Sequence, residues 1–267
     1  MFIIGLSINI WKVKYLRSTH NYIISKLNRD GALHVSLLDP VTTGINELED
    51  ILKIIVDSDS DLIMVGGSTL IDQVMLSQFV SIIKKNCDLP VILFPNNVAS
   101  ITSNADAIWF MSLFNSRNPY YIVGAQMLAA PYIRKYGPEP LPMAYLIIGE
   151  GQTAGFIGDA NPIPYNKPEL AAAYALTAEM FGFKYVYLEA GSGAKSGVPP
   201  SFVKLVKEWT ENIIVVVGGG IRDPDTAYTL VTSGADLVVT GTVLEKNVEL
   251  LGKIVDAVKR GGKEKKL

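Results

Sequence analysis

The chain has 267 residues, of which 49% are apolar and 19% charged, a composition typical of a soluble globular protein. Its formal net charge of −2 shows no basic excess, which argues against a nucleic-acid partner. One cysteine, Cys87, excludes an intrachain disulfide, and with only two histidines present a zinc site is disfavoured. Cys87 is therefore interpreted as structural, and any metal is expected to be a hard ion held by oxygen.

The first 28 residues are predicted to contain an extra helix, from Trp11 to Asn28, that covers one end of the fold. Their apolar start, MFIIGLSINIWKVKY, lacks the basic leading segment and cleavage site of a secretory signal. No apolar run reaches the roughly 18–20 residues of a membrane-spanning helix. A cytoplasmic protein is expected, with transient contact with a membrane surface left open.

Eight short, β-rich apolar runs follow one another along the chain. They are continuously apolar rather than alternating, which is typical of parallel strands covered on both faces. They span residues 32–38, 61–66, 90–94, 107–111, 144–148, 185–189, 212–218 and 236–241.

Most of the segments between these runs show apolar residues at helical spacing, and several begin with a proline suited to a first helical turn. Strand, loop and helix in repetition predict a single-domain α/β protein, a (β/α)8 TIM barrel. The basic tail, residues 259–267, is expected to be flexible. The predicted helices span residues 46–56, 70–85, 119–134, 168–181, 200–209 and 224–233.

Two connections are irregular. Only twelve residues, PNNVASITSNAD, separate the third run from the fourth, so the third helix is expected to be short or replaced by a loop. The segment 149–167 after the fifth run is long and rich in Gly, Pro and Asn. It is predicted to lie on the top face of the barrel, where lids and substrate loops are found.

Chemistry in such barrels is found at the C-terminal ends of the strands. Gly218-Gly219-Gly220 follows the seventh run, and Gly241-Thr242 follows the eighth and opens a helix. Glycine-rich turns expose backbone N–H groups to an anion, so these turns predict a phosphate site, to which Ser192 and Gly193 could add donors. The alternative is that the glycines only make tight turns.

Three further residues stand at strand ends. Asp39 and Ser68 supply the oxygen ligands that Mg²⁺ prefers, although Asp39 could instead form a turn and Ser68 could cap a helix. Glu189, in YLEAGSGA, is placed to act as a general base beside the phosphate, the alternative being a salt-bridged or solvated carboxylate. His34 is interpreted as a buried structural residue. Arg222 either pairs with an acid or helps to bind phosphate.

Six segments in this order carry a family resemblance: LLDP, VGGST, FMSLFNSRNPYYIVGAQMLAAP, YLEAGSGA, VGGGIRDP and VVTGT. They resemble the archaeal geranylgeranylglyceryl phosphate synthases and their bacterial relatives, the heptaprenylglyceryl phosphate synthases. The match covers residues 32–246, and FMSLFNSRNP and YLEAGSGA are specific to the family.

The resemblance implies a Mg²⁺-dependent prenyltransferase that joins sn-glycerol 1-phosphate to geranylgeranyl diphosphate in archaeal lipid biosynthesis. It assigns Asp39 and Ser68 to Mg²⁺, and Glu189, with Tyr187, to catalysis, with Glu189 taking the proton from the attacking hydroxyl. A homo-oligomer, dimer or hexamer, is also implied. The residues expected at the glycerol phosphate are Tyr187, Leu188, Glu189, Ala190, Gly191, Ser192, Gly193, Gly218, Gly219, Gly220, Gly241 and Thr242.

The prenyl tail of such a substrate needs a long apolar groove. The segment 109–136 and the irregular third connection are the candidate walls, the alternative being ordinary core packing. The sequence departs from the family after Asp39, where members often have an acid and a lysine following the proline and this chain has Val41-Thr42-Thr43. Three other readings stay open: a different phosphate-binding barrel enzyme, such as a phosphosugar isomerase, a barrel that binds a phosphate ligand without catalysis, or a synthase with another prenyl length.

Overall fold

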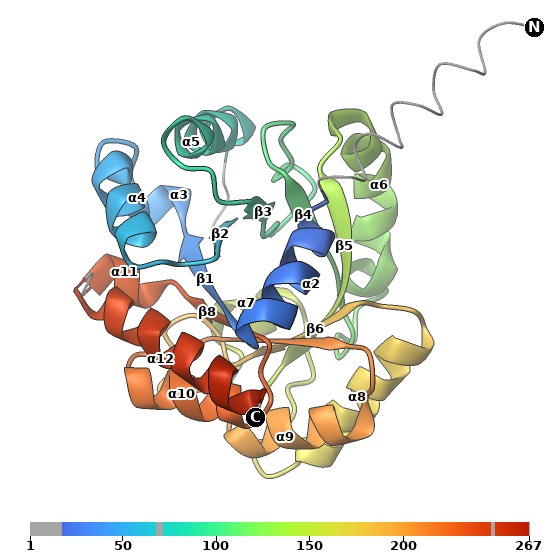
Figure 1. Cartoon of the computed structure of the whole chain (residues 1–267). Helices are drawn as coiled ribbons and strands as arrows, with labels where there is room; N and C mark the ends of the chain where they lie inside the picture. The colour runs from blue at the N-terminus through green and yellow to red at the C-terminus, as the bar shows by residue number, and fades with distance from the viewer. Residues whose placement is uncertain (1–17, 68–71, 247–248, 267) are drawn as a thin grey trace, which may run out of the picture.

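The computed structural model describes residues 18–67, 72–246 and 249–266. Eight strands, hydrogen-bonded in chain order and parallel throughout, close into one barrel (Figure 1). The predicted (β/α)8 barrel is therefore confirmed. The strands are β1 (Leu33–Leu38), β2 (Leu62–Val65), β3 (Val91–Leu93), β4 (Ala107–Leu113), β5 (Glu139–Ile147), β6 (Tyr185–Glu189), β7 (Ile214–Gly218) and β8 (Leu237–Thr240).

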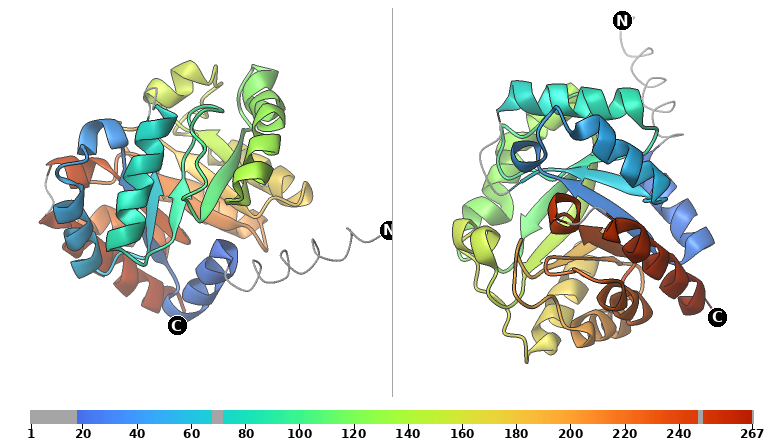
Figure 2. Two further views of the ribbon diagram at one scale, coloured as in Figure 1. Left: turned by 90° about the horizontal axis from the view of Figure 1, so that it is seen from above. Right: turned by 90° about the vertical axis from the view of Figure 1, so that its left-hand side faces the viewer.

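Helices surround the barrel and connect its strands (Figures 1 and 2). Those packed around its sides are α4 (Leu48–Asp57), α5 (Gln73–Asn86), α6 (Ala125–Tyr136), α8 (Pro168–Met180), α9 (Pro200–Trp209), α10 (Pro224–Thr232) and α12 (Leu250–Lys265). Shorter helices are α3 (Pro40–Thr43), η2, a π-helix (Tyr120–Gly124), α7 (Gln152–Ile157) and α11 (Thr242–Lys246), and α2 (Thr19–Asp30) precedes the first strand.

The third connection contains no helix in its described residues, 94–106. The turn residues of PNNVASITSNAD favour local side-chain hydrogen bonds, such as that from the Ala99 N–H to Asn97 Oδ1 at 2.7 Å. The expected replacement of this helix by a loop is confirmed, and the outward residues Ile108 and Phe110 of β4 line a cavity there.

Helix α2 closes the end of the barrel opposite α7 (Figure 2). Ser18 caps it, and Ile23 is buried among the side chains of the barrel interior. At its start, His20 Nδ1 lies 2.7 Å from the Tyr185 hydroxyl at the bottom of β6. The expected covering helix is present from Thr19 onward, and the part of it predicted before residue 18 lies outside the described residues.

The prediction of a flexible basic tail is wrong for residues 259–266. Helix α12 continues through Lys265. Gly262 packs against the backbone of Asp30 and Ala32, so closely that a Cβ atom there would lie 2.4 Å from the Asp30 carbonyl oxygen. Lys265 Nζ lies 2.6 Å from Asp236 Oδ1. The close packing at Gly262 and the buried acidic partner of Lys265 therefore dock a segment whose charge alone suggested exposure to solvent.

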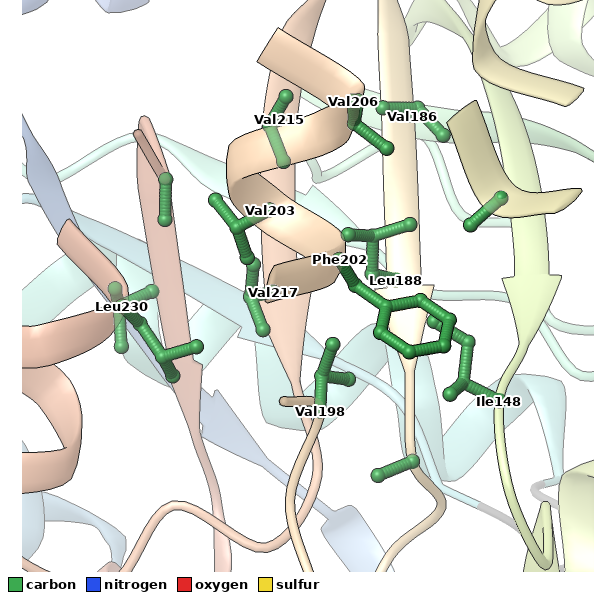
Figure 3. Packing of buried hydrophobic residues seen from close by; sticks show 14 of the residues in the cluster. Ile148, Val186, Leu188, Val198, Phe202, Val203, Val206, Val215, Val217 and Leu230 are labelled. Carbon is green, nitrogen blue, oxygen red and sulfur yellow. The ribbon is translucent and has the colours of Figure 1, made fainter. Parts of the chain in front are cut away.

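The core has two layers, set by the alternation of side chains along each strand. On β6, Tyr185 and Tyr187 point into the barrel, whereas Val186 and Leu188 point outward. The outward residues pack against α8 and α9, where Phe202 fills the space between helix and sheet (Figure 3). This alternation decides which residues can reach a ligand at the barrel mouth. Among the described residues, no helix is long and apolar enough to span a membrane.

Candidate active site

A cavity opens at the C-terminal ends of the strands and extends between β4 and α6. Its polar end contains the predicted acids Asp39 and Glu189 together with glycine turns. Its other end is apolar and aromatic. The predicted site residues that line it are Asp39, Tyr187, Glu189, Ser192, Gly193, Gly219, Gly220, Gly241 and Thr242.

Glu189 is the buried acid of this cavity. It continues the inward alternation of Tyr185 and Tyr187, and only 5% of its surface is exposed. Its Oε1 accepts a hydrogen bond from the Gly191 N–H at 2.6 Å, and its Oε2 accepts one from the Tyr145 hydroxyl at 3.1 Å. The Tyr187 hydroxyl also hydrogen-bonds the carboxylate. The alternative of a solvated or salt-bridged carboxylate is therefore excluded by its surroundings.

Burial raises the pKa of the Glu189 carboxyl above its ordinary value, because desolvation disfavours the charged form. Hydrogen bonds from Gly191, Tyr145 and Tyr187 act in the opposite direction and do not fully offset it. The pKa values of Tyr145 and Tyr187 lie well above that of free tyrosine, first because both hydroxyls are buried. Both phenols therefore remain protonated donors to Glu189. The arrangement fits a general base whose proton affinity is increased by its surroundings.

Glycine is required at the turn after β7. Gly219 has φ of +82°, and a Cβ atom there would lie 2.4 Å from Glu189 Oε1. The absent side chain therefore lets the turn approach the carboxylate. Gly218 likewise makes room for the Tyr187 side chain, because a Cβ atom on residue 218 would lie 1.9 Å from the Tyr187 hydroxyl.

Arg222 organises the loop after β6. Its Nη1 lies 3.3 Å from the Lys195 carbonyl oxygen, and its Nη2 lies 3.2 Å from that of Gly193 and also contacts that of Ala194. Neither expectation for Arg222, an acid partner or a place at the phosphate, describes these contacts, because the guanidinium instead donates to backbone carbonyls. Holding 193–195 in place leaves Ser192 and Gly193 at the cavity.

Four members of the predicted phosphate-binding set do not line the cavity. The side chains of Leu188 and Ala190 are buried in the layer between the strands and the outer helices, so any contact of these two residues with a phosphate would involve their backbone. Gly191 holds Glu189 through its N–H, and Gly218 gives room to Tyr187. These two glycines therefore shape the acid and the phenol.

The eighth strand ends as predicted, in a glycine and a short helix. Gly241 and Thr242 both line the cavity, and α11 begins at Thr242. Together with Gly219 and Gly220 they form a turn-rich wall beside Ser192 and Gly193. This wall, called the glycine cradle below, is the part of the site suited to a phosphate.

Asp39 has a local role and a place in the cavity. Its Oδ1 accepts a hydrogen bond from the Val41 N–H at 2.9 Å, which caps α3. A Cβ atom on Gly67 would lie 2.1 Å from Asp39 Oδ2, so this glycine makes room for the carboxylate. Ser68, the other predicted ligand, lies outside the described residues. No group of three or more His, Cys, Asp or Glu suited to a metal occurs in the described part of the chain.

The donor set still fits Mg²⁺, which usually takes one or two protein carboxylates and completes its shell with water and substrate phosphate. Asp39 is such a carboxylate at the cavity wall. Below the cavity, His34 is fully buried between Ser60 Oγ at 2.8 Å and Thr240 Oγ1 at 2.9 Å. Its expected structural role is confirmed, and so is that of the buried Cys87.

The apolar end of the cavity passes beside β4 where the third helix is missing. Trp109 and Met111, which point into the barrel, line it together with Ile108 and Phe110, which point outward. Residues of both faces can contribute because the loop 94–106 leaves the outer face partly uncovered. Helix α6 forms the facing wall through Ala125, Gln126, Ala129 and Ile133. The segment 109–136 and the third connection thus each contribute some residues to the cavity lining, as the sequence suggested.

Gln126 fixes this wall in place. Its Nε2 donates to the carbonyl oxygen of Met111 on β4 and, at 3.1 Å, to that of Tyr121 in η2. One side chain therefore ties the π-helix to the strand beneath it.

The long fifth connection lies over the cavity. Its helix α7 contributes Thr153, Ala154 and Ile157 to the lining. Asn115 and Ser116 from FMSLFNSRNP hold it down: Asn115 Nδ2 donates to the Asn161 carbonyl at 3.1 Å, and Ser116 Oγ donates to that of Gly158 at 2.6 Å. Asn115 and Ser116 of this motif thus position a loop at the cavity.

Two important residues of the site were not identified from the sequence. Tyr145 donates to Glu189, and Phe94 stacks on the Tyr187 ring at 5.7 Å between centroids, with an interplanar angle of 12°. Tyr145 pairs in register with Tyr187, so alternation counted from the end of β5 would have placed it on the inner face. Phe94 directly follows β3, the shortest strand, where such counting has little support.

Comparison with known proteins supports the resemblance. The model of the PcrB family matches residues 25–262. The geranylgeranylglyceryl phosphate synthase of Thermococcus kodakarensis is 47% identical over 250 residues, covering 93% of this chain and 98% of the relative. That of Thermofilum pendens is 44% identical over 248 residues, covering 92% and 96%.

Solved structures agree. The (S)-3-O-geranylgeranylglyceryl phosphate synthase of Thermoplasma acidophilum, in complex with its substrate sn-glycerol-1-phosphate, superposes with a TM-score of 0.87 at 40% identity, covering 91% of this chain and 99% of that one. The thiamine phosphate pyrophosphorylase of Pyrococcus furiosus, at 12% identity and a TM-score of 0.55, shares the fold alone. The chain therefore belongs to the PcrB family, the family of the geranylgeranylglyceryl phosphate synthases.

Proposed function

We propose that the protein transfers the prenyl group of geranylgeranyl diphosphate to the 3-hydroxyl of sn-glycerol 1-phosphate, with Mg²⁺ present and diphosphate released. One observation carries this proposal: a buried carboxylate, Glu189, stands where a glycine cradle meets an apolar groove in the same cavity. The bound sn-glycerol-1-phosphate in the related Thermoplasma acidophilum structure supports the smaller substrate.

In this proposal the cradle holds the phosphate of sn-glycerol 1-phosphate. Backbone N–H groups in the turns at Gly193, Gly219 and Gly241 provide donors without side chains that would block the anion. The free hydroxyl of the same small molecule then lies toward Glu189. Holding both reactants in one cavity replaces a bimolecular encounter by a positioned one.

Glu189 takes the proton from that hydroxyl as the new C–O bond forms. One carboxylate oxygen is held by the Gly191 N–H and the other by the Tyr145 hydroxyl, so the base keeps a fixed orientation. Its raised pKa makes it a stronger base than an exposed glutamate. The C–O bond of the diphosphate breaks, and its electron pair leaves with the diphosphate.

Asp39, together with Ser68, is the proposed holder of Mg²⁺ beside the diphosphate. The ion supplies charge neutralisation for the leaving group when it is bound. Val41-Thr42-Thr43 follows Asp39-Pro40, so Asp39 is the one carboxylate within residues 39–46.

The apolar groove along β4 and α6 is the proposed place of the prenyl tail. Burial of each CH₂ contributes about 0.8 kcal/mol, so twenty carbons give a gross term that matches that of the charged end. A phosphosugar isomerase on the same fold would have no use for such a groove. The groove therefore favours the synthase over that alternative, whereas the exact prenyl length stays a matter for the assay.

The test is a product assay with the purified protein. Incubation with sn-glycerol 1-phosphate, radiolabelled geranylgeranyl diphosphate and Mg²⁺, followed by butanol extraction, is expected to give a prenylated glycerol phosphate in the organic phase. Parallel reactions with shorter and longer prenyl diphosphates define the preferred length. Absence of product with every prenyl length would refute the proposed function.

A further inference from the structure

An apolar surface lies on the outside of the cavity wall. It consists of the exposed side chains of η2 and α6 together with those of the neighbouring α7, and we call it the rim patch. Val123 is 62% exposed, Met127 63% and Phe156 89%. The other exposed members are Tyr120, Leu128, Tyr132 and Ile157.

The rim patch reverses the usual polarity of a surface helix. A helix on the outside of a globular protein normally presents polar residues to water. Along η2 and α6 the apolar residues at 120, 123, 127, 128 and 132 recur at helical spacing on the exposed side. Large exposed side chains that gather on one face mark an interaction surface rather than scattered surface residues.

The charge along η2 and α6 is positive, whereas α7 lies between the acids Glu150 and Asp159. Residues 115–138 contain three cations, Arg117, Arg134 and Lys135, and no acid. Arg117 pairs with Asp159 at 2.7 Å, so Arg134 and Lys135 supply the net charge. Apolar and aromatic side chains next to cations are the combination found on helices that lie in the interface of an anionic bilayer.

The rim patch is continuous with the cavity. On α6, Ala125 and Ala129 line the cavity, while Met127 and Leu128 face away from it. On α7, Ile157 belongs to both surfaces, because it lines the cavity and is half exposed. The segment before η2 contacts the residues after α7, through Arg117 with Asp159 at 2.7 Å and Ser116 Oγ with the Gly158 carbonyl oxygen at 2.6 Å. A lipid phase against this patch would therefore adjoin the apolar groove.

We propose that the rim patch docks the protein on an anionic lipid bilayer, so that a prenyl lipid passes between bilayer and groove at the edge formed by Ile157. This inference rests on the proposed function, because it is the long prenyl tail that gains from avoiding water. A second copy of the chain could also cover an apolar face, but the adjoining cations and the shared residue Ile157 favour lipid.

Vesicle flotation tests the proposal. The probes are vesicles of phosphatidylcholine alone and of phosphatidylcholine with phosphatidylglycerol in equal parts. The wild-type chain is expected to float with the anionic vesicles and to be released by high salt. Met127→Glu combined with Phe156→Glu is expected to reduce the bound fraction at least about fivefold. Arg134→Gln combined with Lys135→Gln is expected to lose the preference for anionic vesicles.

The matched control is Val74→Glu combined with Met180→Glu, which removes two exposed apolar side chains outside the patch, 65% and 76% exposed, and adds the same charge. The control should float like the wild type. Equal flotation of patch and control variants, or no flotation of the wild type, would overturn the proposal. The proposal would also be overturned if the wild type were oligomeric in gel filtration and the patch variant were monomeric but still floated. The rim patch would then be an interface between copies of the chain.

Turnover in detergent micelles separates this inference from the proposed function. Neither Met127 nor Phe156 lines the cavity, so the patch variant should keep wild-type turnover with micellar substrate while it loses vesicle binding. If the wild type floats but forms no prenylated product, the proposed function is refuted, and so is the passage of a prenyl substrate from bilayer to groove. If product forms but nothing floats, only the docking surface is refuted.

Discussion

Glu189 shows how opposite effects are balanced on one carboxyl group. Burial disfavours its charged form, and three hydrogen-bond donors, Gly191, Tyr145 and Tyr187, favour it. Desolvation is the larger effect, so the pKa is raised. The charged form of a base built in this way is stabilised in part by its three donors. The tyrosines of β5 and β6 are therefore part of the proposed chemistry although neither is the base.

Tyr145→Phe is expected to shift the pH profile. Because the Tyr145 hydroxyl lowers the pKa of Glu189, its removal raises that pKa, and activity that needs the ionised form is lost at a higher pH. The acid limb of kcat/KM should therefore move to higher pH. The phenylalanine ring can keep the contacts with Phe94 and Tyr187, at 5.8 and 5.2 Å between centroids.

The control for this profile is Tyr185→Phe, which removes an inward hydroxyl from the other end of β6, where it contacts His20. Its acid limb should coincide with that of the wild type. A limb that stays fixed in Tyr145→Phe, or moves to lower pH, would show that Tyr145 does not tune the base.

Gly219→Ala tests the close approach between the β7 turn and the base. Its Cβ would meet both Glu189 Oε1, at 2.4 Å, and the Gly191 nitrogen, at 2.8 Å. The control is Gly182→Ala, where φ is +84° and no atom lies within 4 Å of the added Cβ. Both variants should lose about 1–2 kcal/mol of stability from the left-handed backbone.

Only Gly219→Ala should lose most of its turnover, because only there does the methyl group displace Glu189. Steady-state rates and urea denaturation of the two variants provide the comparison. Equal turnover in both would mean that the turn does not position the carboxylate.

At the scale of elements, the replacement of the third helix by a loop shapes the cavity. Eight repeats predict a helix after every strand, yet loop 94–106 replaces the third one. This leaves room for a groove whose other wall is α6, held to β4 by Gln126. The twelve-residue length of the connection was enough to predict the loop. The apolar composition of this region suggested a groove. The position of the groove, beside Ile108 and Phe110, could not be predicted from the sequence because it depends on how α6 packs.

Helix α12 offers a pair of glycines with opposite expected effects. Gly262→Ala would place a Cβ 2.4 Å from the Asp30 carbonyl oxygen and 2.6 Å from the Ala32 nitrogen, so it should destabilise the protein by about 1–3 kcal/mol. Gly252→Ala meets only Ser58 Oγ, at 3.7 Å, and should stabilise the same helix by up to about 1 kcal/mol.

Urea denaturation midpoints of the two variants check this pair. Lower stability of Gly262→Ala beside higher stability of Gly252→Ala would support the docked end of α12. If Gly262→Ala were also stabilised, residue 262 would not be packed against α2 and β1.

At the scale of the whole molecule, the barrel explains which parts of the site were predictable. The C-terminal ends of parallel strands meet at one end of the barrel, so Asp39, Glu189 and the glycine turns could be grouped from the sequence. Strand alternation separates these from Leu188 and Ala190, which the motif alone had included. Contacts between distant segments were not predictable in this way: Arg222 binds the carbonyls of 193–195, and Lys265 pairs with Asp236. Neither pairing has a local pattern.

The barrel brings together the two chemically different parts of the cavity. The ends of β6, β7 and β8 form the glycine cradle, and β4, α6 and α7 form the apolar groove. Glu189 on β6 faces both. The proposed reaction requires that this one carboxylate acts as the base at the junction.

Glu189→Gln is the most direct test of that claim. The amide keeps the size of the side chain but cannot take a proton, so turnover should fall by about 10²–10⁴-fold, the range for general-base catalysis. Binding of sn-glycerol 1-phosphate, measured by calorimetry, should stay close to wild type. The control, Glu150→Gln, changes an exposed acid of the long loop that does not line the cavity and should keep full activity. Turnover of Glu189→Gln within a few-fold of the wild type would contradict the account.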